Sequence, residues 1–111
     1  MKPEDFRTTM KSGRKASTAH LVVYLKRVPG NAQARFGFVV SKAVGGAVQR
    51  NLVKRRLRSA IRDSFLISPP PQSTSFDLVV RALPGSASLD WNKLSSEVVQ
   101  ATNKAKGLPA L

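Results

Sequence analysis

Residues 40–58 read VSKAVGGAVQRNLVKRRLR, in which a glycine pair separates an apolar segment from a strongly basic one. After the glycines we predict a helix from about Ala47 to Phe65, because apolar residues recur there at the spacing of one helical face. We expect this face to pack against the core, and its residues are Val53, Leu57, Ala60, Ile61 and Ser64.

Basic residues form a second row on the same predicted helix. They recur every four positions and so share one face, where like charges repel one another. Such a row needs an external anion or screening by salt. The row comprises Arg50, Lys54, Arg58 and Arg62, and Asn51 and Arg55 widen it. A nucleic-acid surface is the favoured interpretation. A merely solvated helix is the second, and a membrane-surface helix is the third, because the segment lacks a Trp-, Phe- and Leu-rich opposite face.

The composition supports a small domain with a polyanionic partner. The 111 residues include 19 Lys and Arg against 6 Asp and Glu, which gives a formal net charge of +13. Residues 35–62 carry eight of these basic residues and no acidic one, whereas residues 63–111 carry four of each sign. No apolar run approaches the roughly 20 residues of a membrane span, and the N-terminus lacks the apolar segment of a signal peptide. The absence of cysteine fits a reducing compartment, so we expect a cytoplasmic protein.

Before the basic helix the sequence predicts one helix and two strands. A short helix is expected over Pro3–Met10, because proline suits a first helical turn and a glycine follows. β-Branched and aromatic residues predict strands over Leu21–Leu25 and Arg35–Ser41. The turn residues Pro29–Asn31 lie between the two strands, which are therefore expected to pair as a hairpin.

After the basic helix we expect a loop, a strand and a last helix. Residues 68–75 are rich in proline and serine and predict a surface loop. The apolar run Phe76–Ala82 predicts a strong third strand. Ser86 or Ser88 is expected to cap the last helix, which continues to about Thr102.

The predicted elements follow the order α-β-β-α-β-α. This order and the chain length indicate an α+β fold, a single-domain α/β sandwich over residues 1–111. We expect residues 105–111 to form a frayed tail.

Catalytic chemistry is poorly represented in the sequence. The six acidic residues are scattered, and His20 is the only histidine. A nuclease acting alone uses clustered carboxylates for metal ions, or histidines as acid and base. Neither arrangement is visible in this sequence, so we assign no metal site to the protein and keep a protein-only nuclease, with carboxylates gathered by the fold, as an alternative. A different basic binding module is the other alternative, although a helix-turn-helix would need a helix where strands are predicted.

The quoted stretch resembles the signature of the bacterial ribonuclease P protein subunit. The core pattern of that family is Arg-Asn-x-x-Lys-Arg-x-x-Arg, and it matches Arg50, Asn51, Lys54, Arg55 and Arg58. The preceding Ser41–Lys42 pair and the glycine–Ala–Val lead-in also match. The resemblance extends to the first helix, the first strand and the strand after the basic helix, and so covers most of the chain.

This resemblance implies a role beside a catalytic RNA. Members of the family assist a large RNA that, with Mg²⁺, removes the 5′ leader of precursor tRNA by endonucleolytic hydrolysis. The protein would supply no catalytic side chain, the partner RNA would bind most of the Mg²⁺, and no DNA or membrane partner is expected. The family fold also implies a left-handed crossover around the basic helix, against the usual right-handed rule.

The resemblance also implies two groups of site residues. One group would bind RNA: Lys42, Arg50, Asn51, Lys54, Arg55, Arg58 and Arg62. The other would line a cleft for the leader: Phe6, Met10, Tyr24 and Ser41. Core packing is the alternative for Phe6 and Tyr24. A single strand needs stacking or apolar contacts beside positive charge, which fits this combination.

Overall fold

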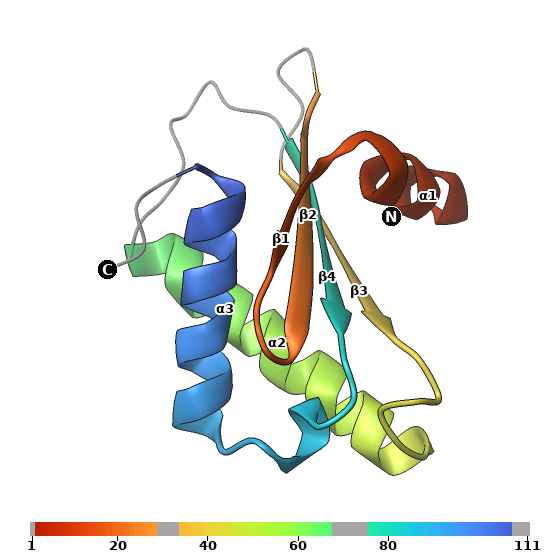
Figure 1. Ribbon diagram of the computed structural model, residues 1–111, viewed down its shortest axis with the longest axis vertical. Coiled ribbons are helices and arrows are strands. Elements are labelled where there is room, and N and C mark those ends of the chain that lie inside the picture. The colour runs from red at the N-terminus through yellow and green to blue at the C-terminus, as the bar shows by residue number, and fades with distance from the viewer. Residues whose placement is uncertain (1, 29–33, 68–75, 108–111) are drawn as a thin grey trace.

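The computed structural model describes residues 2–28, 34–67 and 76–107. Figure 1 shows how the helices lie around one sheet. The helices are α1 (Pro3–Ser12), α2 (Ala47–Ile67) and α3 (Trp91–Ala105), and a short 3-10 turn, η1, covers Ser86–Ser88. The strands are β1 (Arg14–Ser17), β2 (Leu21–Arg27), β3 (Arg35–Val40) and β4 (Phe76–Ala82). The fold is α+β, as predicted, and the observed order α-β-β-β-α-β-α contains one strand more than the predicted order.

The sheet is mixed, and its spatial order is β1-β2-β4-β3. β4 lies between β2 and β3, antiparallel to β2 and parallel to β3. The expected hairpin of β2 with β3 is therefore wrong. β2 pairs instead with β1 on one side and β4 on the other. The parallel strands β3 and β4 are joined by α2, which provides the long crossover connection that parallel pairing requires.

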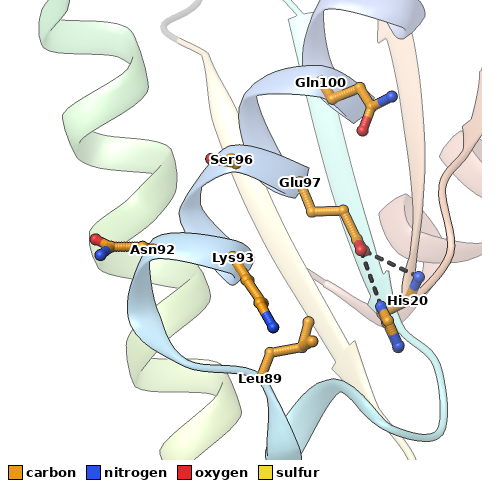
Figure 2. A pocket seen from close by; sticks show the side chains of 7 residues that line it. All are labelled: His20, Leu89, Asn92, Lys93, Ser96, Glu97 and Gln100. Atoms are coloured by element: carbon orange, nitrogen blue, oxygen red, sulfur yellow. Dashed lines mark hydrogen bonds and ion pairs between the residues drawn. The ribbon is translucent and has the colours of Figure 1, made fainter.

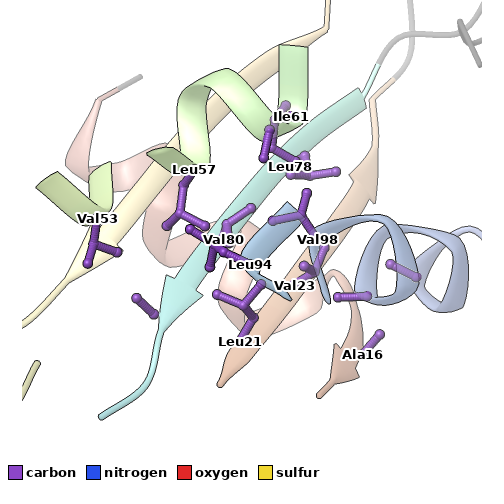
Figure 3. Close-up of a cluster of buried hydrophobic side chains, with 14 of the residues drawn as sticks. Ala16, Leu21, Val23, Val53, Leu57, Ile61, Leu78, Val80, Leu94 and Val98 are labelled. Carbon is purple, nitrogen blue, oxygen red and sulfur yellow. The ribbon is translucent and has the colours of Figure 1, made fainter. Parts of the chain in front are cut away.

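Each face of the sheet has its own apolar cluster. α2 and α3 cover one face, where the larger cluster includes Val53 and Leu57 of α2 and Val98 of α3, all fully buried (Figure 3). The predicted core face of α2 is confirmed, except that Ser64 is only half-buried. α1 packs against β2 and β4 on the other face, over a smaller cluster. The sheet thus separates α1 from the two other helices (Figure 1).

One strand and both ends of the last helix differ most from the predictions. β1 was missed because three of its four residues are exposed, and an edge strand of this kind lacks an apolar signal. α3 is capped by Asp90, whose side chain accepts a hydrogen bond from the Lys93 amide at 2.8 Å, and neither Ser86 nor Ser88 caps it. α3 also continues to Ala105, which is fully buried and so does not belong to a frayed tail.

Three expected segments lie outside the described residues. They are the turn at Pro29–Asn31, the loop over residues 68–75 and the tail from residue 108 onward. Within the described part of the chain, no helix has the length and hydropathy needed to cross a membrane.

Candidate nucleic-acid interface

The first turn of α2 is held by one of its own side chains. The side-chain carbonyl of Gln49 accepts a hydrogen bond from the Gly46 amide at 2.9 Å, and the Gly46 carbonyl accepts one from the Arg50 amide at 2.9 Å. A side chain that returns to the backbone in this way satisfies an amide that helix geometry leaves unpaired. The start of the helix is therefore fixed immediately before its first basic residue.

The predicted RNA-binding residues of α2 lie beside its buried side, and four of them, Asn51, Arg55, Arg58 and Arg62, are exposed. Val53 and Leu57 belong to the buried side and are fully buried. Arg50 and Lys54 are half-buried beside the core. We call the following group the basic face of α2: Arg50, Asn51, Lys54, Arg55, Arg58 and Arg62. It is a continuous cationic surface more than three helical turns long, which can follow a run of phosphates.

One cation of this face is held against the sheet. The guanidinium of Arg58 lies 5.8 Å from the centroid of the Phe38 ring, which is within cation–π distance. Phe38 belongs to β3, one of the two edge strands, so this contact links the basic face to the sheet. Arg62 forms a loose ion pair, in which its Nε lies 4.0 Å from the Asp63 carboxylate.

Ser41 and Lys42 lie in the turn between β3 and α2. Both side chains are exposed, while their carbonyls accept hydrogen bonds from the amides of Val44 and Gly45 at 3.1 and 3.2 Å. The turn holds Lys42 shortly before the start of α2 at Ala47. It also places Ser41 at the end of β3, away from the packed cluster beneath α1.

The other three residues predicted for the cleft meet on the α1 side of the sheet. Phe6 and Met10 of α1 are half-buried and pack against a cluster that contains Tyr24, Val22 and Val79. Tyr24 is only 7% exposed, so its ring is packed in the free protein. Phe6 and Met10 keep part of their surface open. The structure therefore brings Phe6, Met10 and Tyr24 together in one apolar cluster on this face of the sheet.

Cations that sequence reasoning did not select surround this apolar cluster. Lys15 lies directly opposite Tyr24 on the neighbouring strand, so both side chains are on the same face. Lys26 lies opposite Asp77, and Arg81 lies between Val22 and Val39. Lys15 and Arg81 are exposed. The alternation of each strand is visible in the sequence, but the shared face follows only from the registers of β1, β2 and β4.

A pocket lies on the α3 side of the molecule. It has a volume of about 400 Å³ and is lined in part by His20, Lys93 and Glu97 (Figure 2). The Glu97 carboxylate accepts hydrogen bonds from the His20 amide at 2.9 Å and the Thr18 hydroxyl at 3.0 Å, and it lies 2.9 Å from His20 Nδ1. His20 and Glu97 thus join the β1–β2 turn to α3, which is a structural arrangement.

The carboxylates of the described residues are mostly engaged with basic partners. Arg35 binds both Asp5 and Asp77, while Glu97 binds the β1–β2 turn. Over residues 2–28, 34–67 and 76–107, no group of three or more His, Cys, Asp or Glu side chains is arranged to hold a metal ion.

Comparison with known families agrees with the placement of the motif. A family model described as Ribonuclease P matches residues 1–106. The chain is 44% identical to the "Ribonuclease P protein component" of Streptomyces avermitilis, over 94% of this chain and 88% of the relative. It is 41% identical to the protein of the same description from Clavibacter michiganensis, over 91% of this chain and 86% of the relative.

Solved structures show the same fold. The RNase P protein of Staphylococcus aureus matches with a TM-score of 0.77 at 25% identity, covering 98% of this chain and 95% of the other. A mutant of that protein, described as defective in mRNA degradation activity, matches with a TM-score of 0.77 at 28% identity, over 96% and 86% of the two chains.

Proposed function

The chain belongs to the bacterial ribonuclease P protein family, whose enzyme is an endoribonuclease of tRNA processing, and we propose that two of its surfaces bind two different RNA partners. The basic face of α2 binds the catalytic RNA subunit. The α1 side of the sheet holds the 5′ leader of precursor tRNA. The protein thereby assists removal of the leader and contributes no catalytic side chain.

The observation that carries this proposal is the two-sided character of α2. Its buried side is apolar, and its basic face presents arginine and lysine without an acidic residue among them. Arginine forks bind two phosphate oxygens at once, and Asn51 can donate to a phosphate or a ribose. A folded RNA presents the closely spaced phosphates that such a face needs.

Leader binding is supported by the combination of apolar and cationic groups on the α1 side. Phe6 and Met10 offer partly open apolar surface, while Lys15 and Arg81 place positive charge beside it. Single-stranded RNA is bound by this pairing of base contacts with backbone charge. Ser41, at the end of β3, can donate a hydrogen bond to the same strand.

Mg²⁺ belongs to the partner RNA in this proposal. Mg²⁺ prefers several oxygen ligands, often carboxylates. Asp5 and Asp77 are both bound to Arg35, and Glu97 is held by the β1–β2 turn, so these side chains do not fit a magnesium site. We also expect the family features not visible in the pairing alone, namely a left-handed β3–α2–β4 crossover and a cytoplasmic location.

Reconstitution tests the proposal. The purified chain is mixed with a bacterial ribonuclease P RNA at low Mg²⁺, and release of the 5′ leader from a precursor tRNA is followed, with each component alone as a control. We expect the mixture to cleave faster than the RNA alone, and the protein alone to be inactive. No enhancement over the RNA alone would contradict the proposal, and cleavage by the protein alone would favour a protein-only nuclease.

A further inference from the structure

Arg35 connects three elements on the α1 side of the sheet. Its Nε and Nη2 donate to the two carboxylate oxygens of Asp77 at 2.8 and 2.7 Å. Its Nη1 donates to Asp5 Oδ2 at 3.2 Å. Arg35 begins β3, Asp77 lies in β4 and Asp5 lies in the first turn of α1. A single guanidinium thus joins the helix to the two strands.

Asp77 fixes the orientation of this guanidinium. Its carboxylate is almost fully buried, and a buried carboxylate requires a charged or hydrogen-bonding partner. Arg35 lies directly opposite it in the β3–β4 register and forms a two-pronged pair. Its hydrogen bond to Asp77 raises the pKa of Arg35 above its usual value, so the guanidinium stays charged. The two-pronged pair also orients Nη1, which meets α1.

Asp5 receives that third nitrogen at the start of α1. The same Asp5 oxygen accepts a hydrogen bond from the Lys2 amide at 3.2 Å, which closes the N-terminal turn of the helix. Phe6 is the next residue, and Met10 follows one turn later on the same side. Because a helix of ten residues is stiff, fixing its first turn fixes where both side chains lie over the sheet.

We propose that Arg35 is a positioning residue that sets the placement of α1 across the sheet, and with it the width of the surface on which the leader lies. This proposal rests on leader binding by the α1 side of the sheet. Arg35 acts through Asp5 and Asp77, and its role is distinct from the phosphate contacts of α2.

Glu4 provides a matched control for Asp5. Both are acidic residues in the first turn of α1, and Asp5 is the one that pairs with Arg35. If charge alone mattered, D5N and E4Q would raise affinity for every RNA to the same extent. If Arg35 positions α1, D5N lowers the preference for leader-bearing RNA and E4Q does not. Asparagine retains an acceptor for the Lys2 amide, so the helix start is preserved.

The first experiment measures the placement of α1 in the free protein. The chain has no cysteine, so cysteines introduced at Thr8 and Ser96, both exposed, give a unique pair of spin labels on α1 and α3. We expect D5N and R35K to broaden or shift the distance distribution and E4Q to leave it unchanged. An unchanged distribution in both D5N and R35K would overturn the proposal.

The second experiment measures leader preference in the complex with the RNA subunit. The readout is the ratio of dissociation constants for mature tRNA and precursor tRNA. We expect D5N to lower this ratio about threefold, in the range of one partly exposed ion pair, and E4Q to leave it unchanged. A wild-type ratio near one would contradict leader binding itself. A wild-type ratio well above one that D5N leaves unchanged would overturn the role of Arg35 and leave the proposal of leader binding intact.

Discussion

The guanidinium of Arg58 lies over the ring of Phe38, 5.8 Å from its centroid. The contact crosses from the basic face of α2 to the edge strand β3. It restrains a long side chain that would otherwise sample many rotamers, so less entropy is lost when Arg58 meets a phosphate. A partly exposed aromatic residue can in this way contribute to RNA affinity without touching RNA.

We therefore predict that F38L weakens binding of the RNA subunit about two- to fivefold, the range expected for one exposed cation–π contact. The measurement is a double-mutant cycle with R58A, using RNA titrations. The effect of F38L is expected to vanish in the R58A background. An equal effect of F38L in both backgrounds would show that Phe38 acts through packing of β3 instead.

Replacing Arg50, Lys54 and Arg58 together by alanine is predicted to weaken RNA binding and flatten its salt dependence. If wild-type protein neutralises about five phosphates on single strands, log K falls against log salt with a slope near −3.5. Loss of three contacts is expected to bring this slope closer to zero by about two. The circular-dichroism spectrum should be unchanged, because Val53 and Leu57 form the buried side of the helix.

A triple variant at other exposed cations controls for net charge in that experiment. Lys11, Lys93 and Lys104 are exposed and lie on α1 and α3. Their replacement by alanine removes the same charge, yet we expect the slope to change by less than about one. Similar slopes for the two triple variants would mean that binding depends on total charge, and that α2 is not the RNA surface.

Local sequence patterns identified the parts of this fold that local forces determine. The apolar spacing in α2 was sufficient, since Val53 and Leu57 alternate with charged residues at helical period. The run Phe76–Ala82 was equally clear, because a central strand buried on both faces is almost continuously apolar. The basic row on α2 follows from the same periodicity, so this half of the candidate site was visible in the sequence.

Pairing between distant segments was not visible in the sequence. Strands Leu21–Arg27 and Arg35–Val40 are close in the chain, yet β4 separates them in the sheet. The residues of β2 and β3 carry no local signal that β4 lies between them. That placement depends on the crossover through α2. The cations Lys15 and Arg81 were missed for the same reason, since only the strand registers place Lys15 opposite Tyr24 and Arg81 opposite Val22.

Thr102 of α3, which is not among the predicted RNA-binding residues, offers a test of buried polarity. Its side chain is fully buried, and its hydroxyl has no hydrogen-bond partner within the described structure. Valine has the same shape and no hydroxyl to desolvate. We predict that T102V raises the free energy of unfolding by about 1 kcal/mol, or Tm by about 4–8 °C, with RNA binding unchanged. A loss of stability would reveal a partner for the hydroxyl.

Glu97 is predicted to stabilise the fold without contributing to RNA binding. Its carboxylate is largely buried and accepts hydrogen bonds from Thr18 and the His20 amide, with the His20 ring at 2.9 Å. E97A leaves the His20 amide without its acceptor and the Thr18 hydroxyl with only the longer bond to the Leu21 carbonyl at 3.4 Å, and we expect it to lower the free energy of unfolding by about 2 kcal/mol. Urea denaturation measures the loss, and Q100A is the control, because Gln100 lines the same pocket but is exposed.

The same variant separates stability from function. α3 carries Glu97 on the side of the sheet opposite α1, so its loss should not move the residues proposed to bind the leader. At a temperature where E97A is still folded, we expect leader-dependent cleavage by the reconstituted enzyme to match that of wild type. Reduced leader preference in folded E97A would show that the β1–β2 turn is coupled to the α1 side of the sheet. Lys15 would provide the link, because it lies in β1, the strand that leads into this turn.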